Sequence, residues 1–184
     1  MQHEYEPIKL YRNHVYRKDQ ITSRLERLNI KALQIVADET RDAVLNRVSQ
    51  HGGHVGPNLG FVEATVALHY VFDAPKDKLV FDVSHQCYPH KVLTGRAAGF
   101  MGSINDMNAI SGYSSPAECP EYDNFEVGHT STSISLATGL QKARDIKGTD
   151  ENIMPSLATA RSRAARLLRD LTRLRSWAQA SSLW

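Results

Sequence analysis

Five of the eight histidines lie in three short segments, "HGGHVGPNLG" (51–60), "DVSHQCYPHK" (82–91) and "VGHTSTS" (127–133). A neutral imidazole takes up or releases a proton near pH 7, so several histidines in one site suit acid–base catalysis. Each segment alone also has a plain structural interpretation, such as a turn, a buried hydrogen-bonded histidine or a capped helix start. Their occurrence together in one small chain favours a functional site.

The second segment follows a short, largely apolar run that is typical of a buried parallel strand. Residues 79–83 are rich in β-forming side chains, and the run breaks abruptly at Ser84, His85 and Gln86. Because ligands of open α/β sheets bind beyond the carboxyl ends of the strands, we expect His85 at the mouth of such a crevice. The alternative for His85 is a hydrogen-bonded buried histidine, and for His90 and Lys91 a solvated helix start.

Three helices are predicted to position these segments around a parallel sheet. "IKALQIVADETRDAVLNRVSQ" is amphipathic and ends at Gly52 and Gly53; its expected apolar face is Leu33, Val36, Ala37, Val44, Leu45 and Val48. "GFVEATVALHYVF" is apolar on almost every side, which predicts a helix buried between other elements. A third helix begins within "VGHTSTS", where free N–H groups could accept an anion such as phosphate, and ends at Gly148. Residues 96–124 predict a long surface loop, and the fold class is α/β.

Cysteine usage and hydropathy favour a cytoplasmic protein. Cys87 and Cys119 form no CxxC pair, which suits reduced thiols better than a disulfide framework. We find neither an apolar stretch of the roughly 20 residues that a membrane span needs nor the apolar core of a signal peptide.

The composition changes sharply near Met154. Residues 155–184 contain six arginines, one acid, no lysine and no glycine, whereas residues 1–154 carry 16 basic and 19 acidic side chains. A basic amphipathic tail would be a candidate for binding RNA or an acidic membrane.

The motifs closely resemble the N-terminal region of the 1-deoxy-D-xylulose-5-phosphate synthase family, which are transketolase-like thiamine diphosphate enzymes. The resemblance rests on the three segments and covers about residues 20–154. It implies a parallel-sheet domain that binds thiamine diphosphate and magnesium, in a homodimer without nucleic-acid or membrane partners. The implied reaction joins the two-carbon fragment of pyruvate, with loss of carbon dioxide, to glyceraldehyde 3-phosphate during isoprenoid precursor synthesis.

The resemblance also assigns residues. It implies that His54 assists proton transfers over the thiazolium ring and that His85 contacts cofactor and substrate, so His54 and His85 are the expected catalytic pair. It places Gly128, His129 and Thr130 against the cofactor. Threonine replaces the commoner serine at Thr130, and Ser84 stands where the motif usually has glycine. We expect His54, His85 and His129 to face one crevice.

Residues 1–22 are polar and irregular, which predicts an N-terminal arm. The resemblance implies a partial thiamine-diphosphate-binding domain (23–154) and a tail outside the family (155–184). The family's GDG aspartate and a later asparagine, which hold the magnesium ion, have no counterpart here, so no metal ligand is assigned. We expect the tail to form an isolated or poorly ordered helix in place of the family's strand.

A change of reading frame explains the tail. Codons allowed for residues 155–170, read one nucleotide out of step, give I-V-G-D-G-S-L-S-G-G-E-A-L-E-G, which supplies the missing strand and GDG turn. We therefore interpret the chain as a fragment that is inactive by itself, with the frame changed just after Met154 by a single-nucleotide deletion or by a sequencing error. The alternatives are one chain of a split transketolase-like enzyme, or a nucleic-acid or membrane binder that uses the tail.

Overall fold

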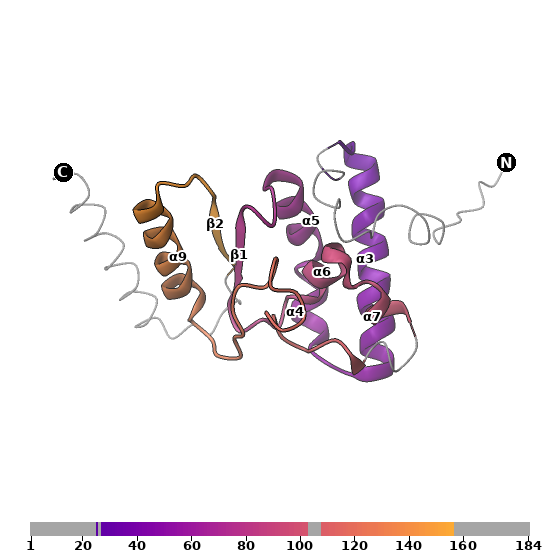
Figure 1. Cartoon of the computed structure of the whole chain (residues 1–184). Helices are drawn as coiled ribbons and strands as arrows, with labels where there is room; N and C mark the ends of the chain where they lie inside the picture. Colours follow the sequence, from indigo (N-terminus) through magenta and orange to yellow (C-terminus); the bar gives the residue numbers. More distant parts are fainter. Residues whose placement is uncertain (1–24, 26, 103–107, 157–184) are drawn as a thin grey trace. The chain divides into compact units, whose positions relative to one another are not determined.

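The computed structural model describes residues 25, 27–102 and 108–156, which fall into two compact units (Figure 1). Among the described residues, those up to 74 and those from 86 to 112 form the helical unit, and residues 75–85 and 113–156 form the sheet unit. The predicted N-terminal arm (1–22) and residues 157–184 of the predicted tail lie outside the described residues.

The helical unit is built on α3 (Ile30–His51), as its amphipathic pattern predicts. The side chain of Asn29 caps the helix by accepting a hydrogen bond from the Ala32 amide at 2.9 Å. Gly52 ends the helix with a φ of 76°, a backbone conformation that favours glycine. Leu45 was wrongly placed on the apolar face, because its side chain is 40 % exposed.

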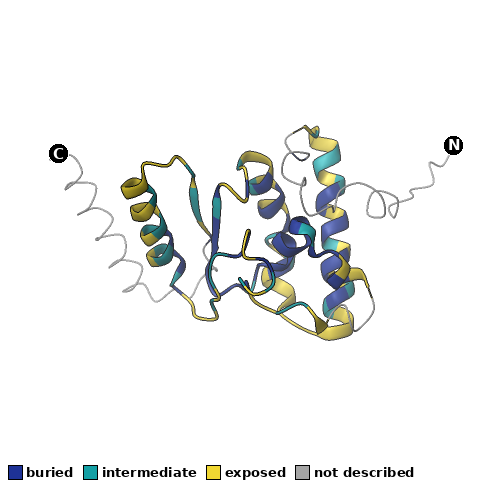
Figure 2. Cartoon of the chain, viewed as in Figure 1, coloured by how far each residue is buried: buried dark blue, intermediate teal, exposed yellow. Residues whose placement is uncertain are grey.

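Helix α5 (Val62–Val71) packs against α3 and is buried on one side only. Its buried residues are Val62, Thr65, Val66 and His69. The core between the two helices consists of Leu25, Val36, Ala37, Val62, Val66 and Leu93. Within the described part of the chain α5 contacts both α3 and α6 (Tyr88–Lys91), as predicted for a helix between other elements, but its burial is incomplete, since Val71 is 64 % exposed. Figure 2 shows exposed positions along α5.

Short helical segments complete this unit: α4 (Val55–Leu59), α6 (Tyr88–Lys91), the kinked η1 (Val92–Arg96) and α7 (Ala98–Met101). The buried Arg47 guanidinium donates to the carbonyls of Gly99 at 3.0 Å and Ile110 at 2.7 Å, and it lies over the rings of Tyr88 and Phe100. The prediction of one surface loop over residues 96–124 is therefore wrong, since parts of this stretch are helical and backbone groups within it are bound from the core.

The sheet unit contains a β–α–β arrangement, which confirms the α/β prediction at this level. Strand β1 (Lys78–Phe81) pairs in parallel with β2 (Ile153–Ser156), with Lys78 opposite Ile153 and Phe81 opposite Ser156. Helix α9 (Ser133–Lys147) precedes β2 and packs against both strands. Gly148 ends α9 in the left-handed conformation, as predicted. Among the described residues β1 pairs with β2 alone, so a central position for β1 stays a prediction.

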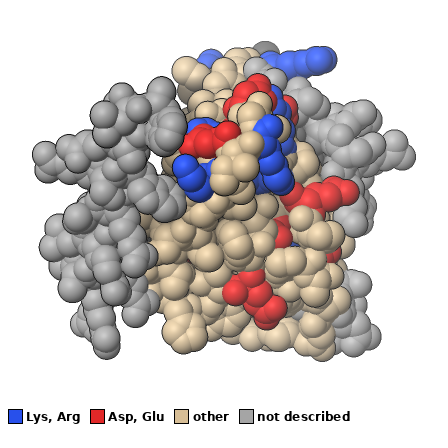
Figure 3. Space-filling model, turned by 60° about the vertical axis from the view of Figure 1, so that its left-hand side comes forward, with Lys and Arg blue, Asp and Glu red and all other residues tan. Residues whose placement is uncertain are grey.

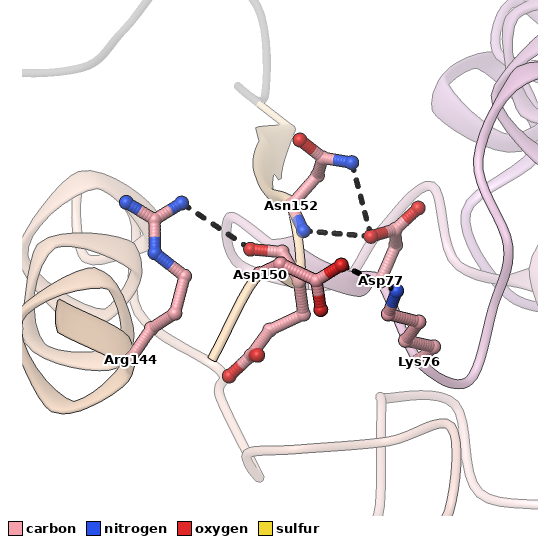
Figure 4. A network of polar contacts seen from close by, with 6 residues as sticks. Lys76, Asp77, Arg144, Asp150 and Asn152 are labelled. Carbon is pink, nitrogen blue, oxygen red and sulfur yellow. Dashed lines mark hydrogen bonds and ion pairs between the residues drawn. The ribbon is translucent and has the colours of Figure 1, made fainter. Parts of the chain in front are cut away.

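Strand β2 extends beyond Met154, where the family-like structure was expected to end. Pro155 and Ser156 pair with Val80 and Phe81, so the strand continues two residues past Met154. A helix in place of the strand is therefore wrong for these two positions. At the start of the ladder, Asp77 accepts hydrogen bonds from the backbone and side-chain nitrogens of Asn152 (Figure 4).

Charged side chains of both signs lie close together on the face shown in Figure 3. Two exposed ion pairs in the sheet unit join Lys76 to Asp150 at 3.0 Å and Arg144 to Asp145 at 2.7 Å. None of the helices in the described ranges is both long and apolar enough to span a bilayer.

Candidate functional site

His54 lies in the helical unit, in a tight connection between α3 and α4. It is the exposed N-cap residue of α4, and its carbonyl accepts a hydrogen bond from the Asn58 side chain at 2.6 Å. The other side-chain atom of buried Asn58, Oδ1, accepts from the Tyr88 amide at 2.9 Å. Gly53 has a φ of 125°, and a Cβ there would lie 3.0 Å from the Tyr88 hydroxyl. The first two segments are thus joined through Asn58, which the sequence did not single out.

His90 and Lys91 are buried, which excludes the alternative of a solvated helix start for them. His90 Nδ1 lies 2.9 Å from His69 Nε2, and the two rings stack with their centroids 5.1 Å apart. Burial, followed by the nearby His90 and Arg96, holds the pKa of His69 well below its usual range. The Lys91 ammonium donates to the Ser111 carbonyl at 3.0 Å. This part of the second segment therefore packs inside the helical unit.

His85 lies in the sheet unit just beyond the carboxyl end of β1, as predicted. Val83 and Ser84 carry the chain there with φ values of 56° and 67°, both in the left-handed region. Left-handed backbone at residues other than glycine costs energy and is found preferentially at functional sites. The half-buried His85 ring packs against the Tyr113 ring with a centroid distance of 5.7 Å.

The expected cofactor-contacting residues Gly128, His129 and Thr130 are exposed. A Cβ placed on Gly128 would lie 3.7 Å from Cε1 of Tyr113. Tyr113 therefore lies next to both His85 and Gly128. The sequence analysis missed it, although an aromatic residue within "ISGYSS" was the available signal.

The start of α9 differs from the prediction of free N–H groups. The Thr132 and Ser133 amides donate to Oδ1 of Asp82, at 2.9 Å and at a longer 3.4 Å. The Thr132 hydroxyl donates to the His129 carbonyl at 3.0 Å. Within the chain an aspartate thus already takes the place predicted for an external anion.

Several buried oxygen atoms close to this point lack a hydrogen-bond partner among the described residues. They are Oδ2 of Asp82 and the hydroxyl oxygens of Ser84, Ser131 and Ser133. Buried polar atoms are normally paired, so unpaired ones in a native site call for a bound group or water. Serine hydroxyls can donate to an anionic oxygen, whereas the carboxylate oxygen requires a donor or a cation.

The structure thus brings His85 and residues 128–130 near Tyr113 and Asp82 within the sheet unit. His54 belongs to the helical unit, so its place in a shared crevice stays a prediction, as do the assigned roles of these residues. Over the described ranges, no three His, Cys, Asp or Glu side chains form a metal-binding group. Both cysteines are buried, and neither forms a disulfide bond within the described part of the chain.

A β–α–β unit with a strained histidine-bearing turn at a strand end defines an α/β protein with a candidate ligand site there. A sequence model described as 1-deoxy-D-xylulose-5-phosphate synthase matches residues 17–160. The chain belongs to this family, whose N-terminal domain is transketolase-like.

Individual relatives agree with the family match. The chain is 52% identical over 124 residues to 1-deoxy-D-xylulose-5-phosphate synthase of Dictyoglomus turgidum, covering 67% of this chain and 20% of the relative. It is 49% identical over 131 residues to the protein of that name from Geobacillus sp., covering 71% and 20%. It is 49% identical over 130 residues to 1-deoxy-D-xylulose-5-phosphate synthase 1, chloroplastic, of Oryza sativa subsp. japonica, covering 71% and 18%. The chain spans about a fifth of the length of these relatives.

Proposed function

We propose that this chain carries the first part of the cofactor-binding region of a 1-deoxy-D-xylulose-5-phosphate synthase. The complete enzyme would condense pyruvate with glyceraldehyde 3-phosphate, using thiamine diphosphate and magnesium. The observation that carries the proposal is the family match over residues 17–160, which includes all three histidine-bearing segments. The proximity of His85 and Gly128 to Tyr113 in the sheet unit supports it.

The chain's own residues fit part of the proposed cofactor. The buried hydroxyls of Ser84, Ser131 and Ser133 have no partner among the described residues and suit diphosphate oxygens as hydrogen-bond donors. The first amides of α9 do not fit, because Asp82 occupies them. The magnesium ion does not fit either, since the described residues form no three-ligand acidic group and the sequence has no GDG motif.

In the complete enzyme we assign proton handling to His54 and His85. Thiamine diphosphate, when bound, supplies a stabilised carbanion, and the residues around it must accept and return protons near neutral pH. Both positions suit this role, because His54 is exposed and His85 is half-buried at a strand end. Tyr113 packs on the His85 ring and restricts its orientation.

We further propose that the 184-residue chain does not hold the cofactor by itself. A helix terminus contributes only roughly 0.3–2 kcal/mol toward an anion, and here its amides are already used by Asp82. A bound metal ion is often the largest local charge in a diphosphate site, so the loss of its ligands removes the main electrostatic attraction.

Calorimetry with magnesium and thiamine diphosphate tests this on two proteins: the 184-residue chain and the product of the gene with one nucleotide restored after Met154. We expect binding and product formation from the restored protein alone. Resequencing across the codons for residues 150–160 gives an independent check. Micromolar binding by the 184-residue chain would show that the tail completes the site.

The assigned histidines are tested in the restored protein. His54→Gln and His85→Gln should each lower kcat by roughly 10²–10⁴, the usual contribution of a general acid or base. His51→Gln is the matched control, because His51 is exposed in the same segment as His54 but bonds to Asn108. Equal losses for His51 and His54 would contradict the assignment.

A further inference from the structure

Asp82 joins the strand end, the His85 turn and the start of α9 within the sheet unit. We propose that Asp82 is a positioning residue for the candidate cofactor site, setting the place of residues 128–130 relative to His85. The inference rests on the proposed function for its purpose, but its contacts belong to the chain alone. Asp82 is fully buried and directly follows β1.

The backbone of Asp82 fixes one end of this arrangement. Its amide donates to the Ser156 carbonyl at 3.0 Å, which closes the β1–β2 ladder. Its carbonyl accepts from the Ser84 amide at 2.6 Å, which closes the left-handed turn leading to His85. The position of His85 therefore follows directly from that of Asp82.

The side chain of Asp82 fixes the other end. Oδ1 accepts from the amides of Thr132 and Ser133, and Thr132 in turn bonds through its hydroxyl to the His129 carbonyl. One carboxylate oxygen thus holds the helix start whose preceding turn carries residues 128–130. A carboxylate at a helix N-terminus is also electrostatically favourable.

Three substitutions separate geometry from charge. Asp82→Asn keeps an acceptor oxygen at the same length and loses the charge; its new amide group replaces Oδ2, which has no partner among the described residues. Asp82→Glu keeps the charge but moves the carboxylate by one methylene group. Asp82→Ala removes both.

The matched control is Asp77→Ala. Asp77 immediately precedes β1, is also buried and also accepts a backbone amide, that of Asn152 at 2.6 Å. Since Asp77 precedes β1 and His85 follows it, Asp77 contributes to the same strand pair at the end away from His85. Figure 4 shows its bonds to Asn152. A substitution there should weaken the sheet unit without moving the candidate site.

The readouts are histidine ring NMR shifts and amide hydrogen exchange of the full 184-residue chain, without cofactor. The Tyr113 ring gives His85 a ring-current shift that depends on their relative position. We expect Asp82→Ala and Asp82→Glu to move the His85 and His129 resonances and to speed exchange at Thr132 and Ser133 about tenfold, as for the loss of a helix cap. Asp82→Asn and Asp77→Ala should leave these signals as in the wild type.

Two results would overturn the proposal. One is that Asp82→Glu, which tests geometry even where the alanine variant fails to fold, leaves the His85 and His129 signals unchanged. The other is that Asp77→Ala moves them as much, because that would indicate general loosening of the unit. Since no cofactor is used, either result stands apart from a failure of the calorimetry that tests the proposed function.

Discussion

Ser84→Gly should stabilise the sheet unit by about 1 kcal/mol, although it removes a buried side chain. Ser84 has a φ of 67°, where an L-residue costs about 1–2 kcal/mol that glycine avoids. The greater conformational entropy of glycine in the unfolded chain offsets roughly 0.5–1 kcal/mol of this stabilisation. The Ser84 hydroxyl is buried without a partner among the described residues, so removing it is favourable. This gain offsets the destabilisation that comes from the lost side-chain packing.

The conformational part of this effect can be isolated by comparing glycine with alanine at two serines. Ser84→Ala removes the hydroxyl but keeps a Cβ at positive φ, so glycine should be more stable than alanine there by about 0.5–1 kcal/mol. Ser133 is the matched position, because its hydroxyl is equally buried and unpaired among the described residues, but it lies in α9. Ser133 is the first residue of α9, so glycine should be less stable than alanine there, by less than the roughly 1 kcal/mol of a helix interior.

Urea unfolding followed by far-UV circular dichroism measures these differences. The reasoning is refuted if the glycine–alanine difference has the same sign at Ser84 and at Ser133, because left-handed strain at Ser84 would then contribute nothing measurable.

Three further predictions concern buried charged or titratable groups. The pKa of His69 is lowered in the folded chain, so on acidification His69 takes up a proton in the unfolded chain before it does in the folded one. The free energy of unfolding should therefore fall as the pH drops below about 6.5. Urea titrations at pH 5 to 7 should show a smaller decline for His69→Gln than for the wild type. Burial and the nearby Asp42 raise the pKa of Glu39 to about 7, so the unfolded chain loses that proton first, from about pH 4.5 upward. Glu39→Gln should therefore exceed the wild type in stability by about 1–3 kcal/mol at pH 8 and match it at pH 4, and equal differences at both pH values would contradict the assignment. Arg47→Lys should destabilise the helical unit by about 2–4 kcal/mol, because lysine cannot serve both carbonyls and both rings at once; Arg41→Lys, a partly exposed control, should cost under about 1 kcal/mol in the same denaturation series.

Elements with a regular hydrophobic period were predictable from the sequence. The pattern of α3, the strand before His85 and the left-handed stop at Gly148 each depend on nearby residues alone. Exposure was harder to predict, because the burial of α5 depends on how much of its surface other elements cover. The last two residues of β2 were not predicted to be a strand, because a proline such as Pro155 by itself argues against one.

The site was predictable where chemistry and family motif coincide, and unpredictable where two distant segments meet. Asp82 bonds to an amide 50 positions away, and the His69–His90 pair spans 21 positions. No local pattern encodes such contacts. Tyr113 was missed for the same reason, because its importance comes from its neighbours His85 and Gly128.

Pro155 determines how the parallel ladder can grow. The carbonyls of Asn152 and Ser156 accept bonds from β1, so the alternating backbone directs position 155 to the opposite edge of β2. Proline has no N–H group, so its presence is compatible with the β1 pairing but leaves the outer edge of β2 without a donor at position 155. A third strand, whether from this chain or from a second molecule, would meet a gap there. Proline is a common protection against edge-to-edge aggregation. The sequence obtained by reading one nucleotide out of step has no proline at this point, so it would remove this protection and allow the strand to pair on both sides.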